Sequence, residues 1–194
     1  MQFRRRSIRL PEYDYSSYGW YFVTICAQDR ELYFENDDVK QMIENMWTKL
    51  PTKFDVDLDE YVVMPNHLHV IVVIKKNDNV GARFIVPRRN EFDKSGFDQS
   101  GRDKSRPYNI RNNPMSISDT TLGKILRYYK AKTTYEIHKY IGDQFVKFGY
   151  FQWQRNYYER IIRNDKELNR IRQYIINNPD NWETDRNNPK NFNL

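Results

Sequence analysis

Residues 61–74 read YVVMPNHLHVIVVI and hold two of the three histidines of the chain. Apolar and β-branched residues lie on both sides of the Pro-Asn pair, so the stretch predicts two strands joined by a short turn. Side chains alternate across a strand, which directs His67 and His69 to one face and Leu68 to the other. This spacing fits either two imidazoles on one divalent ion or two half-exposed histidines near a strand end, and it leaves both interpretations open.

The periodicity of the flanking sequence predicts strands and helices in a regular order. The predicted strands are 19–28, 54–64, 67–74 and 151–162, and the predicted helices are 36–51, 118–142 and 164–179. The order β-α-β-β-α-β predicts an α+β protein of the ferredoxin-like class, with an antiparallel sheet, helices on one face and an additional C-terminal helix. The candidate helix caps are Asn36 or Asp37, Ser118 or Asp119, and Asn164 or Asp165.

Composition predicts one domain over residues 1–194, with a formal net charge of +6 that favours a polyanionic partner, nucleic acid before membrane. Residues 77–118 are rich in Gly, Pro, Ser and Asn without periodicity, so we expect a long, irregular, basic insertion there. Cys26 is the only cysteine and no apolar run approaches membrane-spanning length, which favours a reducing cytoplasm.

Five segments along nearly the whole chain resemble the HUH class of single-strand nucleases, and within that class the bacterial REP-associated tyrosine transposases. They are WYFVTICAQDRELYF (20–34), VVMPNHLHVIV (62–72), LGKILRYYKAKTT (122–134), WQRNYYERIIRN (153–164) and YIINNPDNW (174–182). The insertion at 77–118 has no counterpart in the family pattern. The resemblance implies DNA transposition or recombination chemistry, in which single-stranded DNA near repeat hairpins is cut and rejoined through a 5′-phosphotyrosine.

The resemblance also implies the residues of the site. Tyr174 would be the nucleophile, and His67, His69 and Asn178 would bind Mg²⁺ or Mn²⁺. Tyr174 and Asn178 are four residues apart and share a helix face, but their spacing does not say that this face meets the histidines. Asn177 leaves the third ligand ambiguous by one position. The other tyrosines considered, which fit packing or DNA contact better, are Tyr128, Tyr129, Tyr157 and Tyr158.

The expected partner is single-stranded or hairpin DNA, with no membrane and no small-molecule substrate. A monomer is preferred over a dimer, in a cytoplasmic, nucleoid-associated protein. Basic residues that are candidates for DNA contact are Arg4, Arg5, Arg6, Arg9, Lys124, Arg127, Lys130, Arg155, Arg160 and Arg163. No role is assigned to His138.

Three other functions fit parts of the sequence. A non-catalytic ferredoxin-like module could bind single-stranded nucleic acid through sheet-face aromatics such as those of WYFVT, but it leaves the histidines and the late Tyr-Asn pair unexplained. A replication initiator or relaxase would use the same chemistry with its tyrosine elsewhere in the chain. A metal-dependent hydrolase would need further carboxylate ligands.

Overall fold

The computed structural model describes residues 13–76, 120–142 and 150–191. Four strands form one sheet in the order β2-β3-β1-β4, and every neighbouring pair is antiparallel. Their bounds are β1 Gly19–Cys26, β2 Val56–Met64, β3 His67–Ile74 and β4 Tyr158–Ile162. The α+β class and the antiparallel sheet are therefore confirmed.

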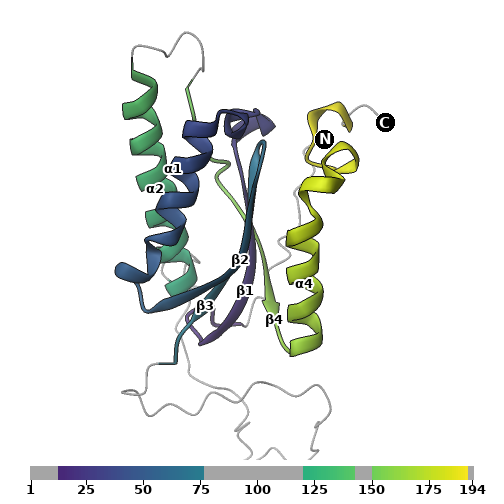
Figure 1. Cartoon of the computed structure of the whole chain (residues 1–194). Helices are drawn as coiled ribbons and strands as arrows, with labels where there is room; N and C mark the ends of the chain where they lie inside the picture. The colour runs from purple at the N-terminus through teal and green to yellow at the C-terminus, as the bar shows by residue number, and fades with distance from the viewer. Residues whose placement is uncertain (1–12, 77–119, 143–149, 192–194) are drawn as a thin grey trace, which may run out of the picture.

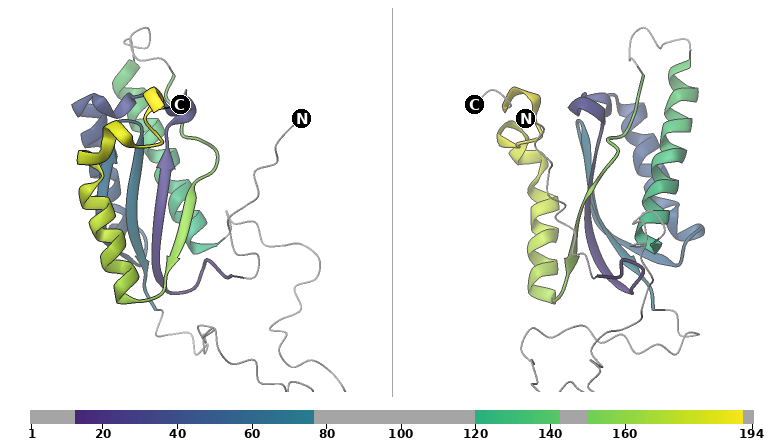
Figure 2. Two further views of the ribbon diagram at one scale, coloured as in Figure 1. Left: turned by 90° about the vertical axis from the view of Figure 1, so that its right-hand side faces the viewer. Right: turned by 180° about the vertical axis from the view of Figure 1, so that it is seen from behind.

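Among the described residues, three α-helices cover the two faces of this sheet. They are α1 Asp37–Thr48, α2 Thr121–Ile141 and α4 Asp165–Asn177. Figures 1 and 2 show α1 and α2 together on one face and α4 alone on the other. Short 3-10 helices occupy Gln28–Arg30, Tyr33–Glu35, Leu50–Thr52, Pro179–Thr184 and Pro189–Asn191.

The two sheet faces have separate hydrophobic cores. Leu68, Val70 and Val72 of β3 pack with the α1 and α2 side chains in the larger core. Ile71, which alternates with them, packs with Phe22 and with the α4 side chains Leu168, Ile171 and Ile175. His67 and His69 have the same parity as Ile71, so the alternation of β3 directs both imidazoles toward the α4 side.

One predicted strand is much shorter in the structure. The strand expected over 151–162 was too long, because Trp153 makes only an isolated bridge with Ala27 and the ladder begins at Tyr158. The ammonium of Lys130 donates to the carbonyl oxygen of Gln154 at 2.7 Å and to those of the next two residues. These carbonyl oxygens therefore accept from a side chain instead of from a neighbouring strand.

The observed caps explain where the helices begin. Asn36 and Asn164 cap α1 and α4 as expected, each accepting a hydrogen bond from a backbone N–H three residues later. The expectation for α2 was wrong by one or two residues, because its N-cap is Thr120, whose Oγ1 accepts from the N–H of Gly123 at 3.1 Å. Ser118 and Asp119 lie outside the described residues.

Candidate active site

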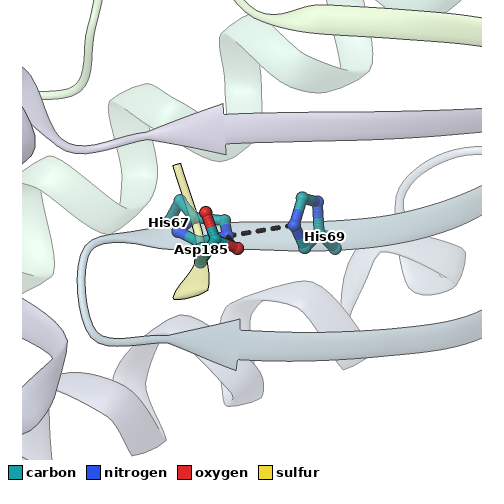
Figure 3. Close-up of side chains that lie close together, drawn as sticks. All are labelled: His67, His69 and Asp185. Carbon is teal, nitrogen blue, oxygen red and sulfur yellow. Dashed lines mark hydrogen bonds and ion pairs between the residues drawn. The ribbon is translucent and has the colours of Figure 1, made fainter. Parts of the chain in front are cut away.

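The two histidines of β3 form the centre of the site. His67 is fully buried and His69 is 2% exposed, so the interpretation as half-exposed histidines is wrong. Their Nε2 atoms lie 3.0 Å apart, and Figure 3 shows the two rings directed toward one another on the same strand. Two donor atoms that each lie about 2.1 Å from one ion, at roughly a right angle, are about 3 Å apart. The spacing of the pair therefore fits a shared metal ion.

Hydrogen bonds to the Nδ1 atoms hold the histidine rings in place. Oδ1 of Asn66 lies 2.9 Å from Nδ1 of His67, and the Asn66 amide group donates to the carbonyl oxygens of Arg30 and Asn187. Since the Nδ2 donors of Asn66 are thus engaged, its Oδ1 accepts from Nδ1–H of His67, which leaves the Nε2 lone pair free for a ligand. Oγ1 of Thr24 lies 2.8 Å from Nδ1 of His69 and can fix the second ring in the same way.

Burial keeps both imidazoles neutral. Desolvation is the main reason that the pKa of His67 falls to about 2, and electrostatic repulsion from His69 (when protonated), Arg30 and Arg186 lowers this pKa further. Desolvation likewise lowers the pKa of His69 to about 3, with a contribution from Arg186. The neutral imidazole is the form that binds a metal ion, so the site is prepared for one at neutral pH.

A carboxylate that the sequence analysis missed lies beside the histidines. Oδ2 of Asp185 is 3.9 Å from Nε2 of His67, and the donor atoms of Asp185, His67 and His69 all lie within 4.8 Å of one another (Figure 3). Nδ2 of Asn187 lies 3.5 Å from the same nitrogen of His67. Two imidazoles and a carboxylate oxygen are a donor set suited to Mg²⁺, Mn²⁺ or Zn²⁺.

The structure brings Tyr174 to this histidine pair. Its hydroxyl oxygen lies 3.3 Å from Nε2 of His69, and its ring makes edge contacts with the rings of His69 and Phe22. The residue is nevertheless 47% exposed, so solvent reaches part of it although the contact between its hydroxyl and His69 is partly buried.

Asn178 follows Tyr174 by one helical turn and is 3% exposed. Its amide group donates to the carbonyl oxygen of Tyr174 at 3.2 Å, which keeps the side chain against the last turn of α4. Asn177 is exposed instead. The assignment of Asn178 as a metal ligand stays a prediction.

The other four tyrosines considered as nucleophiles pack against neighbouring side chains. Tyr129 is fully buried and donates its hydroxyl to the carbonyl oxygen of Ile43, and Tyr128 packs against Phe54. Both belong to α2, across the sheet from the histidines. Tyr158 lies on β4 with its ring 6.1 Å from that of Phe22, and Tyr157 packs on the larger core. His138 donates from Nε2 to the carbonyl oxygen of Phe151 at 2.7 Å, which is a structural role.

The basic residues predicted to contact DNA are spread over both sides of the molecule. Lys124 and Arg127 are exposed on α2, opposite the histidines, and Lys130 is engaged with loop carbonyl oxygens. Arg160 pairs with Glu167 at 2.6 Å. Arg155 and Arg163 are exposed next to β4. Also outside the described residues are Arg4, Arg5, Arg6, Arg9 and the insertion at 77–118.

Comparisons with known proteins indicate a family for this chain. A family model described as "Transposase IS200 like" matches residues 16–83, which include β1, β2, β3 and both histidines. An uncharacterized protein of Haemophilus influenzae is 35% identical over 193 residues, covering 93% of this chain and 91% of the relative. The chain belongs to the IS200-like transposase family. As a member it is a transposase-like protein of a DNA-processing enzyme class.

Two solved structures are similar to this IS200-like transposase. One, described as a REP-associated tyrosine transposase bound to a REP hairpin, has a TM-score of 0.48 and 18% identity over 84% of this chain and 69% of the other. A putative transposase from Deinococcus radiodurans has a TM-score of 0.42 and 12% identity over 83% of this chain and 91% of the other.

Among the described residues, no helix has the length and apolar character that a membrane span requires.

Proposed function

We propose that this IS200-like transposase is a metal-dependent endonuclease and strand transferase of the REP-associated type, which acts on single-stranded DNA. It cuts and rejoins DNA near repeat hairpins through a covalent link to Tyr174. The observation that supports this function most strongly is the 3.3 Å distance between the Tyr174 hydroxyl and Nε2 of His69. A nucleophile, a pair of metal-ligating imidazoles and solvent access then coincide at one place on the α4 side of the sheet.

Tyr174 supplies the nucleophile. Its phenolic oxygen, having lost its proton to solvent, attacks the phosphorus of a phosphodiester and forms an O–P bond. The bond from phosphorus to the 3′ oxygen breaks, and that oxygen takes a proton and leaves as a 3′-hydroxyl. The 5′-phosphate stays on the tyrosine. Rejoining reverses these steps with an incoming 3′-hydroxyl, and because the phosphotyrosine conserves the energy of the broken bond, no nucleotide cofactor is consumed.

His67 and His69 would hold the metal ion through their Nε2 atoms, with Mg²⁺ or Mn²⁺ preferred. When bound, the ion supplies Lewis-acid polarisation of the scissile phosphate. Asn178 is the proposed third ligand, supported by its burial beside Tyr174 on the same turn of helix. Asp185 is a second candidate for that position, supported by its 3.9 Å distance from His67.

The packing of α4 bears on the alternative of a non-catalytic binding module. A module of the RNA-recognition type presents aromatic side chains on an open sheet face. Here Phe22 and Trp20 lie on the face that α4 covers, where they pack with Ile171 and its neighbours. The sheet face that such a module needs is occupied, which favours the enzymatic function.

A covalent adduct tests the proposal. The protein is incubated with end-labelled hairpin DNA from repeats flanking its own gene, with Mn²⁺ or Mg²⁺, and the products are separated in denaturant. We expect an adduct for the wild type and none for Tyr174→Phe or His67→Ala. Cleavage without an adduct would indicate a metal-dependent hydrolase. Tight binding without cleavage in either metal would indicate a binding module, and both results would overturn the proposal.

A further inference from the structure

One ion pair joins α4 to the sheet close to the tyrosine. Nε and Nη2 of Arg172 donate to Oδ1 and Oδ2 of Asp59 at 2.7 and 2.6 Å, a two-pronged arrangement that fixes direction as well as distance. Asp59 lies in β2 where the strand register shifts between Leu58 and Tyr61. Its Oδ1 also accepts from the backbone N–H of Glu60 at 2.9 Å, so the carboxylate is held by its own strand.

The same guanidinium contacts a second strand. Cζ of Arg172 lies 5.7 Å from the centre of the Trp20 ring in β1, a cation–π distance. Because β3 separates β1 from β2, Arg172 reaches across a strand and contacts its neighbour on each side. The side chains of Arg172 and Asp59 are only 33% and 16% exposed, which distinguishes them from a solvated surface pair.

The apolar contacts of α4 do not by themselves fix its orientation. Leu168, Ile171 and Ile175 form one buried stripe, and side-chain packing of this kind has little directional preference. At about 100° per residue, Arg172 and Tyr174 project on opposite sides of that stripe. Rotation of the helix about its axis would therefore move one of these two side chains toward the sheet and the other away from it. A contact that fixes Arg172 also fixes Tyr174.

We propose that Asp59 and Arg172 are a positioning pair, which sets the rotation and axial position of α4 and thereby keeps the Tyr174 hydroxyl at His69 of the same chain. This inference rests on the proposed function of Tyr174. The pair touches neither DNA nor metal in this role. It acts through the helix, and misplacement of a reacting group by about 1 Å can cost about 100-fold in rate.

A matched set of variants tests the pair. Asp59→Asn and Arg172→Gln each break the two-pronged contact, and the double variant breaks it from both sides. Asp57→Asn is the control, because Asp57 lies on the same strand but pairs with Lys75 at 2.8 Å rather than with α4. The measurements are the single-turnover rate of adduct formation at saturating DNA, the Kd for DNA, and amide hydrogen exchange of α4.

We expect the rate at saturating DNA to fall about 10- to 100-fold in either single variant, while the Kd changes less than about threefold. The double variant should be no slower than the slower single variant, since the two residues act through one contact. In Asp57→Asn both quantities should stay within about twofold of wild type. Amides of α4 should exchange faster in Asp59→Asn than in Asp57→Asn.

Several results would overturn the inference: an unchanged rate in Asp59→Asn, an equal loss in the control, or single losses that multiply in the double variant. A wild type that forms no adduct would refute the proposed function instead. The positioning role would then be judged from hydrogen exchange, and unchanged protection of α4 in Asp59→Asn would overturn it.

Discussion

The hydroxyl oxygen of Tyr174 lies 3.3 Å from Nε2 of His69, although 105 residues separate the two in sequence. The contact exists because β3 and α4 meet on the sheet face that α1 and α2 leave free (Figures 1 and 2). A strand that presents two imidazoles and a helix that presents a phenol are thus joined through the small core around Ile71 and Ile171.

Loss of the phenolic oxygen should abolish chemistry and spare the fold. Tyr174→Phe removes the nucleophile, so we expect the adduct-forming rate to fall by at least about 1,000-fold. The side chain is 47% exposed and makes one long hydrogen bond, so the free energy of unfolding should change by less than about 1 kcal/mol. Single-turnover kinetics and urea unfolding measure the two effects. Tyr158→Phe is the control, and an equal loss there would contradict the assignment.

The ligand set can be resolved by metal affinity. Replacing a residue that contacts a metal ligand, but not the metal itself, typically weakens metal binding about 10- to 100-fold. We expect His67→Asn, which removes a ligand, to weaken Mn²⁺ binding far more than that. Calorimetry at pH 7.5 measures the affinity. Asn178→Ala and Asp185→Asn then separate the two candidates for the third ligand, because only the variant that loses a ligand should weaken binding beyond that range. Unchanged affinity in His67→Asn would contradict a metal site at the histidine pair.

Thr24 should matter to the metal without touching it. Its Oγ1 lies 2.8 Å from Nδ1 of His69, so Thr24→Val leaves this buried nitrogen without the contact and the ring less fixed. We expect about 10-fold weaker Mn²⁺ binding. Thr48→Val is the control, since Thr48 bonds only the local carbonyl oxygen of Asn45 in α1. Affinity that is equal in the two variants would show that the Thr24 contact has no effect on the site.

Stability of the metal-free protein should depend on pH through the buried histidines. Burial lowers the pKa of His67 to about 2 and of His69 to about 3, whereas the unfolded chain protonates both with a pKa of about 6.5. Below pH 6.5 both histidines bind protons in the unfolded state but remain unprotonated in the native state. The native protein therefore has its full stability above pH 6.5, and its free energy of unfolding decreases as the pH falls below that value.

Urea unfolding in a chelator between pH 7.5 and 5 measures this dependence. Each histidine should contribute a slope that approaches about 1.4 kcal/mol per pH unit well below its unfolded-state pKa. His69→Leu removes one titrating group. The slope of its unfolding free energy against pH should therefore be smaller by up to about 1.4 kcal/mol per pH unit, which corresponds to one proton. A slope identical to that of the wild type would contradict the role of His69.

The sequence predicted the element order and the shared face of His67 and His69 because both follow from local periodicity. It also predicted that Tyr174 and Asn178 share a helix face. It did not predict that this face meets β3, because the docking of α4 depends on contacts between side chains far apart in the chain, such as Phe22 with Tyr174. The late start of β4 was not predicted, because the carbonyl oxygens of residues 154–156 accept from Lys130, a residue distant in sequence.

Asp185 and Asn66 were also missed. Asp185 lies between two short 3-10 helices, where no periodic pattern indicates which side chains turn inward. Asn66 was interpreted only as part of a turn. Its amide joins the backbone of Arg30 and Asn187 to Nδ1 of His67, an arrangement of three separate segments that spacing along the chain cannot encode.

The most direct test of the account is the identity of the residue that carries DNA. Trypsin digestion of the adduct yields a peptide of residues 173–186 in which Tyr174 is the only tyrosine, while Tyr157 and Tyr158 fall in the peptide 156–160. After nuclease trimming, mass spectrometry should find a 5′-linked nucleotide on peptide 173–186. A nucleotide on peptide 156–160, or on any other peptide, would contradict the central claim that Tyr174 is the nucleophile.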